Sequence, residues 1–389
     1  EFTLAEFNAI SEYEDNSTSL TTLNGLFESL LDNTFVLLET SPALDAGIPN
    51  SLYYDHSGNS RPRDLGYDIG ALEKSLSKSY PISPTCDEII ITDHPLSTII
   101  TVGPENASNL VSIINNAEPY TTIYLKDGFY DIQHQGNILI ESEHITIRSE
   151  SGNRDSVIID SNYKVYGFRV AADDFTLADL TIKRFAYHPI HIQGRDNARL
   201  HNIAVFDGGE QFVKINSHPY DGVREFSDNG TVSCSHFELT PSGSANVRAS
   251  IGPGSCYTGG IDMHAGWNWK FHDSVYKDIY CRNRPGLAEH AIHLWRNGKD
   301  NIIERNVLIN NGRSIGLGLY PGNGRRDFLP GDLDGTTYTK AEVEHVGGVI
   351  RNNIIYTNIG KKAESGISLE GAYESQVYHN TIYMIGSNR

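Results

Sequence analysis

The sequence predicts an all-β fold: a right-handed single-stranded parallel β-helix, which is a solenoid, with a short helical or cap-like segment at its N-terminal end. Short strands in which apolar residues alternate with polar ones recur along the chain. They start at Phe168, Ile190, Val213, Ile261, Ile292, Ile315 and Ile367, and successive starts are 22, 23, 48, 31, 23 and 52 residues apart. The short spacings suit one coil of a solenoid, and the two long ones imply inserted loops or an extra turn.

A second column of residues supports this register. Its members are Asn or Asp residues followed one or two positions later by an apolar residue: Asp179, Asn202, Asp273, Asn306, Asn353 and Asn380. Side-chain amides stacked at the corner of successive coils satisfy the backbone groups of the turns, and Asn tolerates the left-handed conformation that such corners need. We therefore expect one polar ladder along one corner of the solenoid.

The chain divides by composition into three parts. Residues 1–75 are expected to be helical and then cap-like, residues 76–98 a linker, and residues 99–389 the parallel β-helix. The β-helix is interrupted by two segments rich in Gly, Pro and Asp, which predict inserted loops at about 217–259 and 320–346. Long loops on a rigid scaffold commonly line a binding groove.

Two further elements follow from local patterns. Apolar residues three and four positions apart predict helix within residues 1–35. Residues 109–117 predict a short helix over the open end of the core, and residues 122–130 predict a strand, a turn and a second strand.

Charge and cysteine content narrow the partners. Lys and Arg number 31 against 49 Asp and Glu, a net charge of −18, which excludes a general nucleic-acid binder and argues against membrane association. No apolar run reaches the length of a membrane span, and we expect a monomer. The four cysteines lack metal-binding spacing; a disulfide between Cys234 and Cys256 and four free buried thiols are equally compatible with the sequence.

Alternation also assigns side chains to faces. If the apolar residue of each strand points inward, its neighbours point outward. One outward column then contains Arg169, His191, Lys214, Asp262, His293, Gly316 and Ser368, and the next contains Ala171, Gln193, Asn216, His264, Trp295, Gly318 and Glu370. Coils lie about 4.8 Å apart, so neighbouring members should touch, provided that the insertion before Asp262 is only a loop. The two glycines are expected to leave an empty groove floor.

These columns match the needs of β-elimination from a uronic acid glycoside. That reaction requires a neutralised carboxylate, a base for the C5 proton and an acid for the leaving oxygen. Arg169 could clamp the carboxylate, Lys214 or a histidine could be the base, and His264 or His293 the acid. Hydrolysis instead needs paired carboxylates, and only Asp262 stands in the columns, with Glu370 distant. A solvated polar face is the simpler alternative.

The substrate would contact further residues along the same face. These are Gln193, Asn216, Trp295, Glu289 and Trp267. Trp267 could stack on a sugar or could equally cap a coil. Glu289 precedes a strand, where a role at a coil corner fits as well as a role in the groove.

Residues 41–73 carry a resemblance to a known class of protein. Ser41-Pro42-Ala43-Leu44-Asp45-Ala46-Gly47 and Asp68-Ile69-Gly70-Ala71-Leu72-Glu73 resemble the closing segment at the C-terminal end of many secreted right-handed parallel β-helix proteins. Here this segment precedes the repeats. An upstream β-helix that has been cut away explains its position, and a circular permutation or a free-standing cap would look the same.

Residues 208–217, Gly-Gly-Glu-Gln-Phe-Val-Lys-Ile-Asn-Ser, loosely resemble a strand of chondroitinase B-like and alginate lyases. The resemblance implies a calcium ligand at Glu210 and a base at Lys214, and Asp207 could join Glu210 at the Ca²⁺. In that family an arginine follows on the next coil, where this chain has Asp262 and His264.

The resemblance implies a polysaccharide lyase, secreted or periplasmic in a bacterium or held at the cell surface. It would cleave an acidic, uronic-acid-containing polysaccharide such as alginate by β-elimination. A β-helix glycoside hydrolase or a uronate epimerase would use the same scaffold, and so would a non-catalytic carbohydrate-binding or adhesin-like β-helix.

Overall fold

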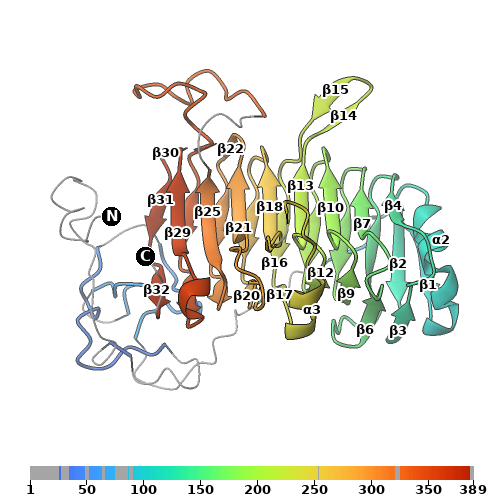
Figure 1. Cartoon of the computed structure of the whole chain (residues 1–389), viewed down its shortest axis with the longest axis horizontal. Coiled ribbons are helices and arrows are strands. Elements are labelled where there is room, and N and C mark those ends of the chain that lie inside the picture. Colours follow the sequence, from blue (N-terminus) through green and yellow to red (C-terminus); the bar gives the residue numbers. More distant parts are fainter. Residues whose placement is uncertain are drawn as a thin grey trace.

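The computed structural model describes residues 26–27, 35–48, 52–63, 66–74, 86, 91–252, 254–319 and 325–385. Three long parallel sheets form the sides of a solenoid, and each coil passes through sheets 1, 2 and 3 in that order (Figure 1). Sheet 1 contains β4 (Ile138–Ile140), β7 (Phe168–Val170), β10 (Ile190–Gln193), β13 (Val213–Asn216), β18 (Ile261–His264), β21 (His290–Trp295), β25 (Arg313–Gly318) and β29 (Ser365–Glu370).

Sheets 2 and 3 follow the same coils. Sheet 2 contains β1 (Thr98–Val102), β2 (Thr121–Leu125), β5 (Thr146–Ser149), β8 (Thr176–Ala178), β11 (Arg199–His201), β16 (Thr231–Ser233), β19 (Lys270–His272), β23 (Ile302–Glu304), β27 (Val349–Arg351) and β31 (Gln376–Tyr378). Sheet 3 contains β3 (Gly128–Asp131), β6 (Val157–Asp160), β9 (Thr181–Phe185), β12 (Ala204–Gly208), β17 (His236–Glu238), β20 (Val275–Lys277), β24 (Val307–Ile309), β28 (Ile354–Thr357) and β32 (Thr381–Met384). The parallel β-helix predicted from the sequence is thus confirmed.

The core lies inside the coils, where the apolar residues of all three sheets meet. Trp269 stacks on Phe271 with ring centroids 5.7 Å apart, and Phe237 stacks on Tyr276 at 4.9 Å. Each fully buried aromatic side chain contributes about 1.5–3 kcal/mol relative to exposure. Because a coil covers its apolar face only with its neighbours, stability is shared between adjacent coils.

The corner between sheets 2 and 3 carries two columns of residues, where one was expected. Residues with a positive φ form the first column: Asp179, Asn202, Cys234, Asp273, Arg305, Asn352 and His379. The side-chain ladder occupies the next position along the chain, where Asn353 Nδ2 donates to Asn380 Oδ1 at 2.9 Å and Asn306 Nδ2 donates to Asn353 Oδ1 at 3.1 Å. The predicted column mixed these two positions, because both favour Asn.

The two long spacings between strand starts, 48 and 52 residues, each correspond to one coil that carries insertions. β13 pairs directly with β18, and β25 pairs directly with β29. The first insertion includes an antiparallel hairpin of β14 (His218–Tyr220) and β15 (Val223–Glu225), which projects from the solenoid (Figure 1), and the helix α3 (Pro241–Asn246). Beside the later coils, β22 (Gly298–Lys299), β26 (His345–Val346) and β30 (Ala372–Tyr373) form a small parallel sheet, and η2 (Gly360–Lys362) is a 3-10 turn.

The N-terminal end of the solenoid is closed by a helix, as predicted. η1 (Pro104–Asn109) leads into α2 (Leu110–Asn115), which buries Leu110, Val111 and Ile114 on the core. β2 and β3 form the predicted strand, turn and strand. The helix predicted within residues 1–35 lies almost wholly outside the described residues. Among the described residues, no helix has the length and apolar character needed to cross a bilayer.

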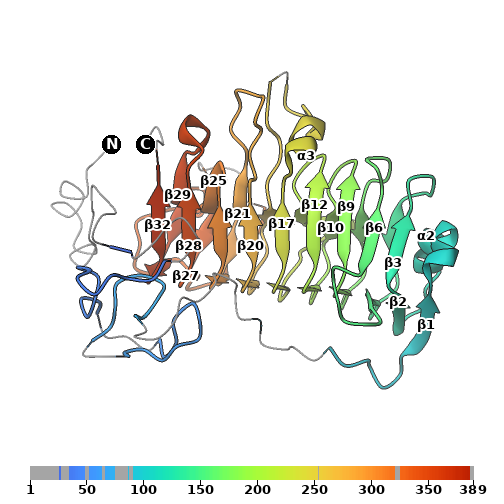
Figure 2. The same cartoon turned by 90° about the horizontal axis from the view of Figure 1, so that it is seen from below.

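The closing segment, residues 35–74, covers the opposite end of the solenoid (Figures 1 and 2). Phe35 and Ala71 pack on Ile354 of β28, and Ala71 N donates to Thr381 Oγ1 of β32 at 3.1 Å. His56 Nδ1 lies 3.0 Å from the carbonyl oxygen of Asn352. This segment therefore packs on coils of its own chain, at β28 and β32.

Two disulfides correct the predicted cysteine pairing. Cys86 pairs with Cys234 and Cys256 pairs with Cys281, so the Cys234–Cys256 bridge and the free thiols are both wrong. Cys86 lies in the segment that joins the closing segment to β1, so its disulfide ties that segment to the corner of a middle coil. Farther along, Arg148 Nη1 donates to the Ile91 carbonyl oxygen at 2.6 Å.

Candidate active site

Sheet 1 carries the outward columns in the expected register. His191 pairs with Arg169 on one side and with Lys214 on the other, Lys214 pairs with Asp262, and Asp262 pairs with His293. No additional coil therefore stands between Lys214 and Asp262. The outward face is not open, however: Lys214, Asp262 and His293 are 5%, 4% and 1% exposed.

A charged cluster of three residues forms the centre of this face. Lys214 Nζ makes an ion pair with Asp262 Oδ2 and lies 3.0 Å from His264 Nε2. The other oxygen of Asp262 accepts from Trp295 Nε1 at 2.8 Å and lies 3.3 Å from His264 Nε2. The carboxylate is thus fully engaged, and the ammonium is held in a buried pair.

The protonation states follow from this geometry. Burial alone would raise the pKa of Asp262, but the Lys214 cation and the hydrogen bond with His264 hold it well below its usual range. Burial lowers the pKa of His264 to about 4, against the opposing effect of Asp262. At neutral pH the cluster is an ion pair beside a neutral imidazole.

A second neutral imidazole, His191, lies on the coil before this cluster. Burial and then the positive neighbours His188, Lys214 and Arg169 lower the pKa of His191 to about 3. Asn216 Nδ2 lies 3.4 Å from Nε2 of its ring, and the ring of His188 packs edge-on against it with centroids 5.3 Å apart. Beside it, Arg169 Nε donates to Gln193 Oε1 at 2.5 Å, and Arg169 is otherwise exposed.

A pocket of about 210 Å³ opens onto His191 and Arg169. Tyr166 and Tyr187 stack on each other at its edge, with centroids 4.0 Å apart. His188 also lines it, and sequence reasoning missed all three of these residues. Tyr187 and His188 sit in the turn just before β10, where alternation says nothing about direction. Tyr166 is 52% exposed, which makes this stack an aromatic surface available to a sugar ring.

The groove floor beyond the cluster is not empty, contrary to expectation. A Cβ on Gly316 would lie 2.6 Å from Nε2 of His290, so the imidazole of His290 fills the space that the missing side chain leaves. Gly318 has a φ of +76° and lies against the backbone of Glu370. Both glycines accommodate protein atoms rather than a ligand.

The two tryptophans are also already occupied. His293 stacks on Trp295 at 5.1 Å, and the Arg296 guanidinium lies 4.2 Å from the centroid of the same ring. Trp267 is 8% exposed, its Nε1 donates to the Asn297 carbonyl oxygen, and Arg326 lies 3.6 Å from its centroid. The packing of Trp267 fits the capping alternative, and Trp295 donates to Asp262.

The carboxylates expected at a calcium ion are held by protein groups. Glu210 contacts His188 Nε2 at 3.1 Å, Arg248 Nε at 3.2 Å and Ser250 Oγ at 2.7 Å. Asp207 accepts from Thr240 N at 2.8 Å and from Thr240 Oγ1 at 2.9 Å, which anchors the start of α3. A carboxylate held by an imidazole, a guanidinium and a hydroxyl does not fit a Ca²⁺ site, which takes about six to eight oxygen ligands.

Glu289 and His293 lie next to the charged cluster. His293 Nε2 donates to the Gly318 carbonyl oxygen at 2.9 Å, which turns that nitrogen away from the groove and disfavours a role in leaving-group protonation. Burial and then the charge of Asp262 raise the pKa of Glu289. Asp262 and Glu289 are therefore two neighbouring carboxyl groups whose pKa values move in opposite directions.

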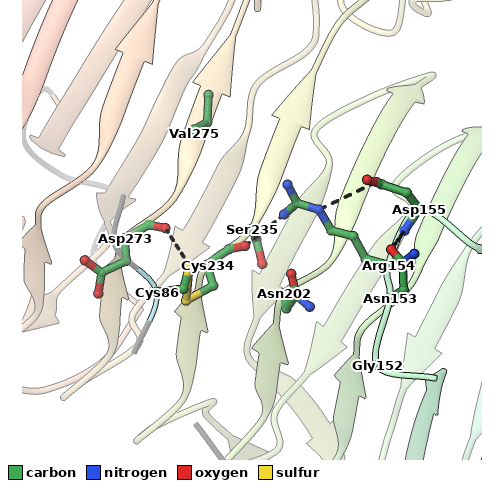
Figure 3. Close-up of a pocket in the computed structure, with 10 residues that line it drawn as sticks. All are labelled: Cys86, Gly152, Asn153, Arg154, Asp155, Asn202, Cys234, Ser235, Asp273 and Val275. Carbon is green, nitrogen blue, oxygen red and sulfur yellow. Dashed lines mark hydrogen bonds and ion pairs between the residues drawn. A yellow bond between two sulfur atoms is a disulfide. The ribbon is translucent and has the colours of Figure 1, made fainter. Parts of the chain in front are cut away.

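A second hollow, of about 280 Å³, surrounds the Cys86–Cys234 disulfide on the far side of the solenoid (Figure 3). Arg154 Nη1 donates to the Cys234 carbonyl oxygen at 3.0 Å within it. Arg154 and Asp155 form an ion pair in its lining, and none of its lining residues is a histidine. The groove of sheet 1 is the better candidate for chemistry.

Solved structures of similar architecture include an adhesin and polysaccharide lyases. PfbA, a surface adhesin of Streptococcus pneumoniae, aligns with 73% of this chain and 75% of its own, at 12% identity and a TM-score of 0.42. An alginate lyase from Paenibacillus sp. str. FPU-7 aligns over 73% of this chain and 99% of its own, at 12% identity and a TM-score of 0.40. Pectate lyase Pel9A aligns over 75% of this chain and 78% of its own, at 13% identity and a TM-score of 0.40.

No protein-family model matches the sequence, and no curated protein does.

Proposed function

We propose that this protein is a carbohydrate-active β-helix enzyme, a lyase that cleaves a uronic-acid-containing polysaccharide by β-elimination in the groove of sheet 1. One observation carries the proposal: His191, a neutral and partly exposed imidazole, stands in register between two cationic side chains, Arg169 and Lys214. A base flanked by cations suits the abstraction of a proton next to a carboxylate, because the cations stabilise the negative charge that develops.

Each residue then has a distinct task. Arg169, exposed at the pocket edge, binds the uronate carboxylate. His191 takes the C5 proton; the incoming carboxylate offsets the positive neighbours and raises the basicity of the ring. Lys214, the cation next to His191 in the strand register, stabilises the developing charge and donates to the leaving oxygen. This assignment favours the histidine over the lysine as base.

The test is a panel of uronic-acid polysaccharides assayed for the ultraviolet absorbance of the unsaturated product. We expect product from wild type and a loss of about 10²–10⁴-fold in kcat/KM for His191→Ala, the usual worth of a general base. The matched control is His236→Ala, a partly buried histidine of sheet 3 that contacts Glu238, and it should retain full activity. If His191→Ala keeps the wild-type rate, the assignment of His191 as the base is wrong. The same holds if Lys214→Ala loses activity while His191→Ala does not.

The pH profile checks the same residue. Because the pKa of His191 in the free protein is lowered to about 3, the base is neutral throughout the neutral range. We expect kcat/KM to stay level from pH 7 to pH 5 and to fall only as the imidazole is protonated below that. An acid limb centred near 6.5, the ordinary value for histidine, would contradict the assignment.

Hydrolysis is the second candidate, and the pair of Asp262 and Glu289 favours it. A carboxyl group with a raised pKa beside one with a lowered pKa is the pattern of a general acid with a base or nucleophile. The panel separates the two reactions: new reducing ends without unsaturated product indicate hydrolysis, and neither signal indicates a binding protein.

The disulfides support the proposed location. All four cysteines of the chain are paired, and such bonds persist in oxidising compartments. We propose that the protein works in the periplasm, at the cell surface or outside the cell.

A further inference from the structure

A group of three side chains at the end of the groove floor has the donor set of a metal site. Glu289, His290 and His293 each offer one ligand atom, and these atoms lie within 4.8 Å of one another. His290 and His293 are 3% and 1% exposed, with ring centroids 4.4 Å apart. Glu289 has a side chain 29% exposed, so the group is reached from its carboxylate side.

Hydrogen bonds to the far nitrogens determine the tautomers of both rings. The Gly318 carbonyl can only accept, so His293 Nε2 carries the proton and Nδ1 carries the free electron pair. Ser368 Oγ lies 2.8 Å from His290 Nε2 and 3.5 Å from the Ile315 carbonyl oxygen. With the hydroxyl proton directed at that carbonyl, Nε2 donates to Oγ and Nδ1 of His290 holds the free pair.

These free pairs have no donor. Nδ1 of His290 is buried and makes no hydrogen bond within the described part of the chain. Nδ1 of His293 lies 3.8 Å from Glu289 Oε2, which is beyond hydrogen-bond distance. Within the described residues, no lysine or arginine comes within 4.0 Å of the Glu289 carboxylate. Nearby cations are committed elsewhere, Lys214 to Asp262 and Arg313 to Glu364.

An arrangement of three acceptors without a donor is stabilised by a cation. We propose that Glu289, His290 and His293 bind a divalent transition-metal ion of the Zn²⁺ type, with Nδ1 of each imidazole and a carboxylate oxygen as ligands. The buried hydrogen bonds from Nε2 to Gly318 and Ser368 are the outer contacts that orient metal-binding histidines in proteins.

The donor set selects the kind of metal. Two imidazole nitrogens and one carboxylate suit Zn²⁺, Co²⁺ or Ni²⁺, whereas Ca²⁺ and Mg²⁺ take oxygen ligands. Three protein ligands leave a fourth position open. This inference is independent of the proposed elimination, because neither Arg169, His191 nor Lys214 belongs to the set.

The experiment measures binding and needs no substrate. The whole protein is treated with a chelator, dialysed and titrated with Zn²⁺ by calorimetry, and Co²⁺ binding is followed by its visible absorbance. We expect one ion per chain, retained in a large excess of Ca²⁺. Because all four cysteines are in disulfides, a thiolate cannot account for the uptake.

Two variants and one control locate the ion. Glu289→Gln changes a partly exposed residue at constant shape, and His290→Gln changes a buried one; each should weaken Zn²⁺ binding at least tenfold. His236→Gln should bind as wild type does, and circular dichroism verifies that each variant is folded. If the wild type takes up no Zn²⁺, the proposal is wrong and a water molecule occupies the site instead. Unchanged uptake in both ligand variants would overturn it equally.

Discussion

At the scale of single residues, the Lys214–Asp262 pair shows how the groove differs from a solvated polar face. Both side chains point away from the core, yet they are 7% and 6% exposed. The side chains of His264 and Trp295 contact the pair. Removing one partner from such a pair leaves an uncompensated buried charge, which is far costlier than losing a surface ion pair.

Lys214→Met should therefore lower the free energy of unfolding by about 3–5 kcal/mol, because Asp262 loses its cation in a buried place. Lys214→Met combined with Asp262→Asn should lose less than the sum of the two single variants, since the double variant has no buried charge to compensate. Chemical denaturation gives the free energy of unfolding of the wild type, the two single variants and the double variant. Additive losses would mean that the two side chains are not energetically coupled.

At the scale of elements, the closing segment is clamped to the last coils by one buried guanidinium. Arg61 Nη1 donates to Glu73 Oε1 at 2.8 Å, and Nη2 donates to the Gly70 carbonyl oxygen at 2.7 Å and to Asn352 Oδ1 at 3.4 Å. The side chains of Arg61 and Glu73 are 0% and 1% exposed. This clamp joins two halves of the closing segment and, through Asn352, binds them to the corner of the solenoid.

Arg61→Ala should destabilise this end by about 3–5 kcal/mol, because Glu73 would remain buried and unpaired. Hydrogen exchange should then quicken in residues 35–74 and in β28 and β32, and less in β2 to β6. Arg63→Ala is the matched control: its Nη1 donates to Asn59 on the exposed surface, and its loss should cost under about 0.5 kcal/mol. Equal effects of the two variants would contradict the clamp.

At the scale of the whole molecule, buried neutral histidines make stability depend on acid. Burial lowers the pKa of His345 and of His379 to about 4, and burial also lowers that of His56. In the unfolded chain these rings titrate near 6.5, so between pH 6.5 and 4 the unfolded state binds protons that the folded state does not bind. The free energy of unfolding that these neutral rings contribute above pH 6.5 is therefore lost as the pH falls through 4. Asp207, whose pKa burial raises, opposes this in part.

The melting temperature should accordingly fall between pH 6.5 and pH 4. His345→Gln should flatten that fall, because His345 is 0% exposed and contributes on the order of 1 kcal/mol per pH unit. The exposed His134→Gln is the control and should leave the slope unchanged. A melting temperature independent of pH in this window would show that the folded and unfolded states bind the same number of protons there.

Features of the whole molecule that follow from a local sequence pattern could be predicted from the sequence, and features that depend on contacts between distant residues could not. The coils, the register of sheet 1 and the helix α2 were predicted, because inward apolar residues recur once per coil and a helix end-cap has its own periodicity. The disulfide partners were not, since Cys86 reaches Cys234 over a sequence separation of 148. Tyr166, Tyr187 and His188 were missed because turn residues have no fixed direction.

By itself, the sequence determined which residues of this protein face inward and which share a coil position, because alternation and period are local properties of the chain. Only the tertiary structure decided what the outward residues do. His290 fills the space over Gly316 and reaches Ser368 two coils on, and Lys214 is buried with Asp262 beside His264 and Trp295. Side-chain reach and burial are set by packing between coils, and no single strand encodes them.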